Sequence, residues 1–149
     1  MKTRQLGKIT VSEVGMGCMA FSHGYGQIPP EQYSIEAIRG AYDHGCTFFD
    51  TAEIYSPGLA GIGHNERIVG KALQNVRDQV VIGTKLFLDR SEVRQEGSVY
   101  GAVRRHLEDS LDRLQTDWVD IYYLHRTMGG VRIEDVAEAM GQLIEHRLI

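Results

Sequence analysis

Cysteine is scarce in this chain, with only Cys18 and Cys46 among its 149 residues. The two lie far apart, and neither belongs to a CxxC pair or to a Cys/His cluster with metal-ligand spacing. A chain of this length buries roughly 68–70% of its unfolded surface, so it needs no disulfide or metal to form a core. We therefore expect two reduced thiols, as in a cytoplasmic protein, and no metal site.

Long apolar runs and clusters of basic residues are also lacking. The N-terminal stretch MKTRQLGKITVSEVG has no apolar run of signal-peptide length, and no later stretch approaches a membrane span. The formal net charge is -4, without a basic run, which makes nucleic acid or an anionic membrane a poor candidate partner. With 42% hydrophobic and 24% charged residues, the composition is typical of a globular protein, and we expect it in the cytoplasm.

What the sequence does contain is a regular alternation of short β-rich runs and amphipathic helical segments. Residues 4–12 fit a β-hairpin. Four runs then predict strands, at residues 14–18, 47–50, 79–85 and 118–125. Each precedes a segment with apolar residues at helical spacing, at about 29–45, 64–74, 98–114 and 133–146. Four β-α repeats of this kind predict a parallel sheet covered by helices.

The spacing of the strand ends makes the fold prediction more specific. Gly17, Asp50, Lys85 and His125 mark these ends, at intervals of 33, 35 and 40 residues. The longest interval includes a loop after the third strand, at residues 87–98. Eight such units form a (β/α)8 barrel of about 250 residues. We therefore expect an α/β fold of the (β/α)8 TIM-barrel type, with only the first four βα units, a half barrel, over residues 1–149.

A half barrel leaves its first and fourth strands as unpaired edges. Parallel strands of this apolar kind are normally covered on both sides. We therefore expect that the chain pairs with another copy through these edges, or is part of a longer protein, or folds poorly.

Polar side chains gather at the predicted carboxyl ends of the strands, where parallel α/β folds carry their chemistry. Because strand side chains alternate, Asp50, Lys85 and His125 are predicted to face the barrel axis together. Tyr55 follows Asp50 on a loop that can return over the same end of the barrel. We expect these four side chains to converge.

Such a set suits protonation of a carbonyl oxygen. A phenol with a pKa of about 10 is a poor acid at neutral pH unless an ammonium favours its anion, as Lys85 would do for Tyr55. Asp50 would keep Lys85 charged, and His125 could donate a hydrogen bond to the carbonyl. No side chain donates hydride, so a cofactor must supply it.

Four motifs, in order and correctly spaced, resemble the aldo-keto reductases. They are DTAEIY at 50–55, NERIVGKAL at 65–73, VVIGTK at 80–85 and DWVDIYYLHR at 117–126. The stretch GMGCMAFS at 15–22 is similar to the start of one branch, the bacterial oxidoreductases and plant auxin-induced-type proteins. The resemblance covers nearly the whole chain.

The resemblance implies an NADPH-dependent oxidoreductase that reduces an aldehyde or ketone to an alcohol. By position, it makes Tyr55 the general acid, Lys85 and Asp50 its tuning partners, and His125 the carbonyl-orienting residue. The residues implied near the nicotinamide end of NADPH are Gly17, Cys18, Met19 and Asp50. In that family the second half of the barrel supplies most of the cofactor site, so we expect most of that site outside these four units.

Several alternatives compete with this interpretation. The chain can be a remnant or assembly module that keeps these residues without catalysis, and the Asp50–Lys85 pair can serve stability alone. Lys85 as a Schiff-base lysine is disfavoured, because Asp50 would keep its amine protonated. His125 can be a core histidine, and His106 is expected to be packed or at a boundary.

One motif is misleading. Residues 15–20, GMGCMA, satisfy the G-x-G-x-x-G/A pattern of dinucleotide-binding domains. That pattern requires a helix to begin at once, so that its N-terminus meets the pyrophosphate. Here FSHGYGQIPP intervenes. We therefore do not expect a Rossmann domain.

Overall fold

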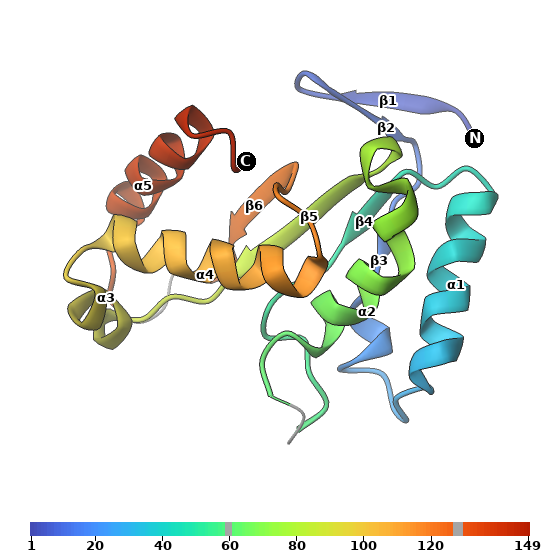
Figure 1. The fold of residues 1–149 in the computed structure, drawn as a ribbon, viewed down its shortest axis with the longest axis horizontal. Coiled ribbons are helices and arrows are strands. Elements are labelled where there is room, and N and C mark those ends of the chain that lie inside the picture. The colour runs from blue at the N-terminus through green and yellow to red at the C-terminus, as the bar shows by residue number, and fades with distance from the viewer. Residues whose placement is uncertain (59–60, 127–129) are drawn as a thin grey trace.

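A computed structural model describes residues 1–58, 61–126 and 130–149. Its main sheet has the strand order β3-β4-β5-β6, and every neighbouring pair is parallel (Figure 1). The strands are β3 (Met16–Gly17), β4 (Phe48–Asp50), β5 (Val81–Leu86) and β6 (Ile121–Leu124). The parallel order predicted from the β-α alternation is confirmed, and within the described ranges the sheet does not close into a barrel.

The four predicted helices follow their strands in turn. They are α1 (Glu31–Asp43), α2 (His64–Leu73), α4 (Val99–Leu114) and α5 (Ile133–Glu145). Helix α4 begins where Ser98 caps it, since the Ser98 hydroxyl oxygen accepts a hydrogen bond from the Gly101 N–H at 2.9 Å. Helix α1 begins only after Pro30, and a short 3-10 turn, η1 (Met19–Phe21), fills part of the interval after β3. This late start agrees with the exclusion of a Rossmann domain.

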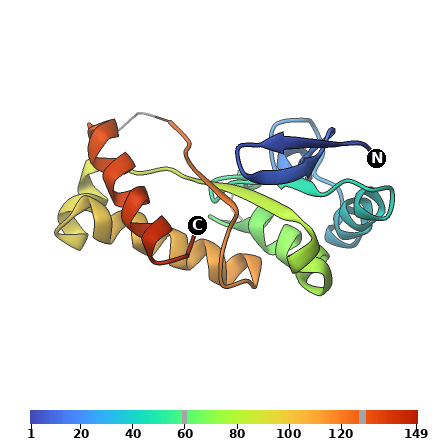
Figure 2. The same cartoon turned by 90° about the horizontal axis from the view of Figure 1, so that it is seen from above.

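The predicted N-terminal hairpin is present. It consists of β1 (Thr3–Leu6) and β2 (Ile9–Ser12), which pair antiparallel around Gly7, whose φ of 61° favours glycine. Figure 2 shows α2 and α4 on one face of the main sheet and the hairpin on the other. We call the helix-covered side the outer face and the hairpin side the inner face.

One helix was not predicted. Residues 87–98 were expected to be a loop, but α3 (Arg90–Glu96) lies within them. Asp89 forms a capping box with Glu92, because each side chain accepts a hydrogen bond from the other's backbone N–H. A second short element, the 3-10 helix η3 (Gln74–Gln79), connects α2 to β5.

The core lies between the outer face and the helices. Phe49 is fully buried there, whereas its neighbour Phe48 lies on the inner face, as the strand alternation predicts. The helices pack closely, since a Cβ on Gly70 of α2 would come within 2.6 Å of the Leu114 carbonyl oxygen at the end of α4. Other core members from the strands and helices are Ile82, Leu86, Ile68, Val69, Leu73, Val103 and Leu107.

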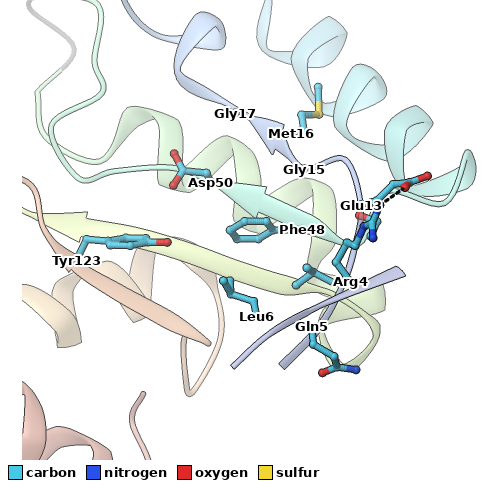
Figure 3. Close-up of a pocket in the computed structure, with 12 residues that line it drawn as sticks. Arg4, Gln5, Leu6, Glu13, Gly15, Met16, Gly17, Phe48, Asp50 and Tyr123 are labelled. Atoms are coloured by element: carbon cyan, nitrogen blue, oxygen red, sulfur yellow. Dashed lines mark ion pairs between the residues drawn. The ribbon is translucent and has the colours of Figure 1, made fainter. Parts of the chain in front are cut away.

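The inner face, by contrast, is open. A solvent-exposed cavity of about 500 Å³ lies between this face and the hairpin, and Figure 3 shows Phe48, Asp50 and Tyr123 along it, with Leu6 of β1 opposite. Gly17 borders the same space, and a Cβ there would meet nothing within 4 Å. In the described part of the chain no helix is both long and apolar enough to cross a membrane.

Candidate active site

Lys85 near the end of β5 is the centre of the predicted constellation. Its Nζ donates hydrogen bonds to Asp50 Oδ1 at 2.5 Å, to the Thr51 carbonyl oxygen at 2.7 Å and to the Tyr55 hydroxyl oxygen at 3.2 Å. The parallel pairing of β4 with β5 brings Asp50 and Lys85 to the same sheet edge. The side chains of Lys85 and Asp50 are 15% and 35% exposed, so the ion pair lies at the border of the solvent.

His125 follows directly after β6, where its backbone N–H donates to the Leu86 carbonyl oxygen at 2.9 Å. Its ring meets the Tyr55 ring edge to face, with centroids 5.6 Å apart and an interplanar angle of 86°. All four predicted side chains therefore converge at the carboxyl end of the sheet. We call Asp50, Tyr55, Lys85 and His125 the mouth group.

The electrostatics of the mouth group leave His125 uncharged at neutral pH. Burial lowers the pKa of the His125 imidazole, and the positive charges of Lys85 and Arg126 lower it further. Its Nδ1 is buried and has no hydrogen-bond partner among the residues that the structure describes. A buried polar atom without a partner is uncommon in folded proteins and is frequent at functional sites.

The direction of the hydrogen bonds decides what Tyr55 can do chemically. The Lys85 ammonium can only donate, so the Tyr55 oxygen is the acceptor and its own O–H proton remains available. Lys85 Nζ also lies 4.8 Å from the centroid of the Tyr55 ring. The arrangement can therefore deliver a proton from Tyr55 to a carbonyl oxygen while an ammonium stabilises the phenolate left behind.

The residues predicted near a nicotinamide ring are placed less uniformly. Gly17 pairs with Asp50 and borders the open cavity, and Met19 is half-buried in η1. Cys18, however, is fully buried in the core, and burial and the charge of Asp50 raise the pKa of its thiol to about 12. Its backbone N–H donates to the Asp50 carbonyl oxygen at 2.8 Å. Both cysteines are free, as expected.

Asn65 is a site-supporting residue that the sequence analysis did not single out. Its buried side chain accepts from the Thr51 hydroxyl at 2.7 Å and donates to the Cys18 carbonyl oxygen at 2.8 Å. It also donates to the Ser22 hydroxyl oxygen at 2.7 Å. Asn65 thereby joins the segments after β3 and β4, which border the mouth. Its only signal in the sequence was its place at the start of the NERIVGKAL motif.

Comparison with known proteins agrees with this geometry. Probable aldo-keto reductase 1 of Glycine max is 37% identical over 139 residues, which cover 91% of this chain and 38% of that protein. Aldo-keto reductase YhdN of Bacillus subtilis is 38% identical over 140 residues, covering 92% and 41%. An aldo/keto reductase of Klebsiella pneumoniae, solved in complex with NADP and acetate, matches with a TM-score of 0.74 and 34% identity, covering 94% and 44%.

The chain thus spans about two fifths of the length of the curated relatives that it matches. Solved aldo-keto reductases, which have the TIM-barrel fold, cover nearly all of this chain, so its four βα units are of the TIM-barrel type. The sequence model described as Aldo/keto reductase family matches residues 13–146, which include the whole mouth group. This chain belongs to the aldo/keto reductase family.

Proposed function

We propose that the chain carries the catalytic half of an NADPH-dependent carbonyl reductase, which reduces an aldehyde or ketone to an alcohol. The observation that carries this proposal is the contact of one ammonium, Lys85 Nζ, with both the Asp50 carboxylate and the Tyr55 hydroxyl. The family supports it, as does the relative from Klebsiella pneumoniae that was solved with NADP. Under this proposal residues 1–149 form the N-terminal half of a barrel.

Each member of the mouth group has one role in the proposed reaction. Tyr55 donates its proton to the carbonyl oxygen, and Lys85 stabilises the phenolate that results. Asp50 holds Lys85 in place, because its carboxylate accepts a hydrogen bond from the Lys85 Nζ at 2.5 Å. The neutral His125 donates a hydrogen bond to the same carbonyl oxygen and so orients the substrate.

The residues present fit the nicotinamide end of the cofactor. NADPH, when bound, supplies the hydride that is added to the carbonyl carbon. Free space beside Gly17 would let a flat ring approach Asp50 and Tyr55, because a side chain there would occupy it. Met19 would contribute from the η1 turn that follows Gly17, and Cys18 would contribute only its backbone, since its thiol is buried. We propose that the rest of the cofactor site comes from outside these four βα units.

The open inner face requires a complement under this proposal. Four further βα units would close the barrel, supplied either by additional chain or by a second copy that pairs through β3 and β6. Light scattering of the purified chain measures this directly: closure by a second copy predicts a dimer. The cytoplasmic location expected from the sequence stays a prediction.

The reduction is tested by replacing Tyr55. We expect Tyr55→Phe to lower kcat for NADPH oxidation with 4-nitrobenzaldehyde by about 10²–10⁴-fold, the usual contribution of a general acid. Tyr33→Phe is the matched control, because Tyr33 is 61% exposed on α1, and we expect it to leave the rate unchanged. Equal rates for the wild type and Tyr55→Phe would overturn the assigned mechanism.

A second candidate is a non-catalytic assembly module that keeps the mouth group by descent. The uncovered inner face favours it, because the sheet presents its unpaired edges and the 500 Å³ cavity to solvent. Titration of the chain with NADPH, followed by cofactor fluorescence, separates the two functions. The reductase predicts saturable binding, whereas the module predicts none.

A further inference from the structure

A second set of charged side chains lies on the outer face, directly behind the mouth group. We call Glu53, Glu66, His106 and Arg113 the buried group. Glu53 and Glu66 have side chains that are 2% and 0% exposed, and those of His106 and Arg113 are 7% and 15% exposed. Nothing in the proposed reduction uses these four residues. Buried charges are costly unless they are paired, so their arrangement calls for an explanation.

Glu53 connects the buried group to the mouth group, because it lies on the chain between Asp50 and Tyr55. One of its carboxylate oxygens accepts from the Phe87 backbone N–H at 2.5 Å, just past the end of β5. The other accepts from His106 Nδ1 at 2.8 Å. Its own backbone N–H donates to the Lys85 carbonyl oxygen at 3.3 Å. Glu53 therefore holds the loop that carries Tyr55 against the strand that carries Lys85.

His106 is in turn held between two carboxylates. While Nδ1 faces Glu53, Nε2 lies 3.2 Å from Glu92 Oε1 on α3. The other Glu92 oxygen accepts from the Asp89 N–H in the capping box of that helix. An imidazole donates from both nitrogens only when it is protonated. His106 therefore bridges the Tyr55 loop and α3, and the carboxylates on either side of its ring favour the protonated form.

The charge balance of the buried group leads to the same conclusion. Arg113 Nε lies 2.6 Å from Glu66 Oε2, and its guanidinium is 3.9 Å from Glu53. One guanidinium thus faces two buried carboxylates, and a charged His106 supplies the missing positive charge. Burial lowers the pKa of His106, but the hydrogen bond and charge of Glu53, with the charge of Glu92, outweigh this and raise it.

The other ionisable groups near Glu53 and His106 come from three elements. Arg105 on α4 places its Nη2 atom 3.4 Å from Nε2 and can only donate to it, so this contact opposes a proton on Nε2; the same guanidinium forms ion pairs with Glu92, Glu96 and Asp109. Burial and the charge of Glu53 keep the pKa of Tyr122 on β6 well above its usual value, so Tyr122 stays neutral. Burial also raises the pKa of Glu66 on α2, although Arg113 opposes this. Arg105 and Glu66 therefore also contribute to the charge balance around Glu53 and His106.

We propose that Glu53 and His106 are positioning residues, which hold the Tyr55 hydroxyl against Lys85 and make that geometry respond to the protonation of His106. We call this coupling between the protonation of His106 and the position of Tyr55 the link. Its role in catalysis rests on the proposed reduction, but the link itself does not. When His106 loses its proton, Glu53 loses the positive charge of its partner, and the hydrogen bond that holds the Tyr55 loop to α4 weakens.

Nuclear magnetic resonance of the labelled full chain tests the link without any need for activity. The imidazole signals give the midpoints of His106 and His125, and the Tyr55 ring and Lys85 Nζ signals are followed over the same pH range. Because the pKa values of the two histidines are shifted in opposite directions, their midpoints lie on opposite sides of the usual value. We expect the Tyr55 and Lys85 signals to change at both midpoints.

The variants identify which histidine causes which change. In His106→Gln and Glu53→Gln the change at the upper midpoint should disappear, while the change at the His125 midpoint remains. His146→Gln and Glu108→Gln are matched controls, since the exposed His146 hydrogen-bonds the half-buried Tyr100, and Glu108 pairs with Arg104 on the solvent side of α4. Both controls should behave like the wild type. A purely structural His106 would destabilise the protein when replaced, but would not couple its titration to Tyr55.

A wild-type Tyr55 signal that does not respond at the His106 midpoint overturns the inference, even if a variant fails to fold. An upper change that persists in folded His106→Gln overturns it as well. If the Tyr55 signal responds to His106 but the protein does not oxidise NADPH, the proposed reduction is contradicted and the link is not. Where oxidation is measured, we expect Glu53→Gln to lower kcat about tenfold with little change in KM, because it displaces the acid rather than the substrate.

Discussion

The two faces of the sheet hold two groups of four ionisable side chains that differ in the burial of their carboxylates and in how completely their polar atoms are hydrogen-bonded. In the mouth group, Asp50 and Lys85 border the solvent, and a buried nitrogen of His125 has no partner among the described residues. In the buried group, both carboxylates are almost fully enclosed, and each oxygen of Glu53 and Glu66 accepts a hydrogen bond. Residues 53 and 55, only two positions apart, belong to different groups.

This difference indicates which residues should control stability and which should control chemistry. A buried ion pair that loses one partner leaves an uncompensated charge in a medium of low polarity. A pair at the border of the solvent, such as Asp50 and Lys85, is partly compensated by water instead. We therefore expect the buried group to determine folding and the mouth group to determine reactivity, with Glu53 and His106 as the link.

The largest effect on stability is expected from Arg113→Met. This change removes the guanidinium that pairs with Glu66 at 2.6 Å, and it should cost about 3–5 kcal/mol of unfolding free energy. Urea denaturation measures it. Arg104→Met is the matched control on the same helix, because its pair with Glu108 is exposed and should contribute little to stability. Similar costs for both variants would remove the distinction between the two groups.

A pH-dependent effect is expected from His106→Gln. The folded pKa of His106 is raised, so its stabilisation is complete below the unfolded value of about 6.5 and is lost as pH rises through the folded value. The wild type should therefore exceed His106→Gln in unfolding free energy by about 1.5–3 kcal/mol near pH 6, the usual contribution of charged hydrogen bonds. Denaturation at several pH values checks whether this difference narrows toward alkaline pH; a difference that widens contradicts a charged His106.

The smallest effect on stability is expected from Asp50→Asn. Asp50 is 35% exposed, so loss of its pair with Lys85 should cost less than about 1 kcal/mol. The same change should reduce NADPH oxidation strongly, because it releases Lys85 from its position beside Tyr55. Thermal denaturation gives the change in stability, and the rate of NADPH oxidation is measured on the same preparation. A large loss of stability with normal turnover would mean that this pair serves folding alone.

The sequence predicted the elements that local patterns determine. Alternation in the strands and the positions of the strand ends predicted that Asp50, Lys85 and His125 lie together on one side of the sheet. Helix α3 was missed because it has only seven residues, although the capping box of Asp89 and Glu92 was visible as D-x-x-E. Cys18 was expected beside the cofactor because its motif resembles the family. Such a resemblance assigns a position in the chain, but it does not show that the thiol of Cys18 is buried.

The Glu53–His106 contact could not be predicted from the sequence, for a different reason. It joins residues 53 positions apart, and no local period relates a loop after β4 to the middle of α4. His106 falls near the apolar stripe of its helix, so a packed histidine was the natural expectation, and its burial is confirmed. That Glu53 is the partner of His106 can be seen only from the packing of α4 on the outer face.

The most direct test of the central claim, that the mouth group transfers a proton while a nicotinamide transfers hydride, uses NADPH deuterated at C4 of the nicotinamide. The chain, with its complement if the barrel proves to need one, is incubated with 4-nitrobenzaldehyde, and the alcohol is analysed by mass spectrometry. The account predicts one deuterium on the carbinol carbon, formed by the wild type and Tyr33→Phe and nearly absent with Tyr55→Phe. Saturable cofactor binding without any deuterated alcohol would contradict it.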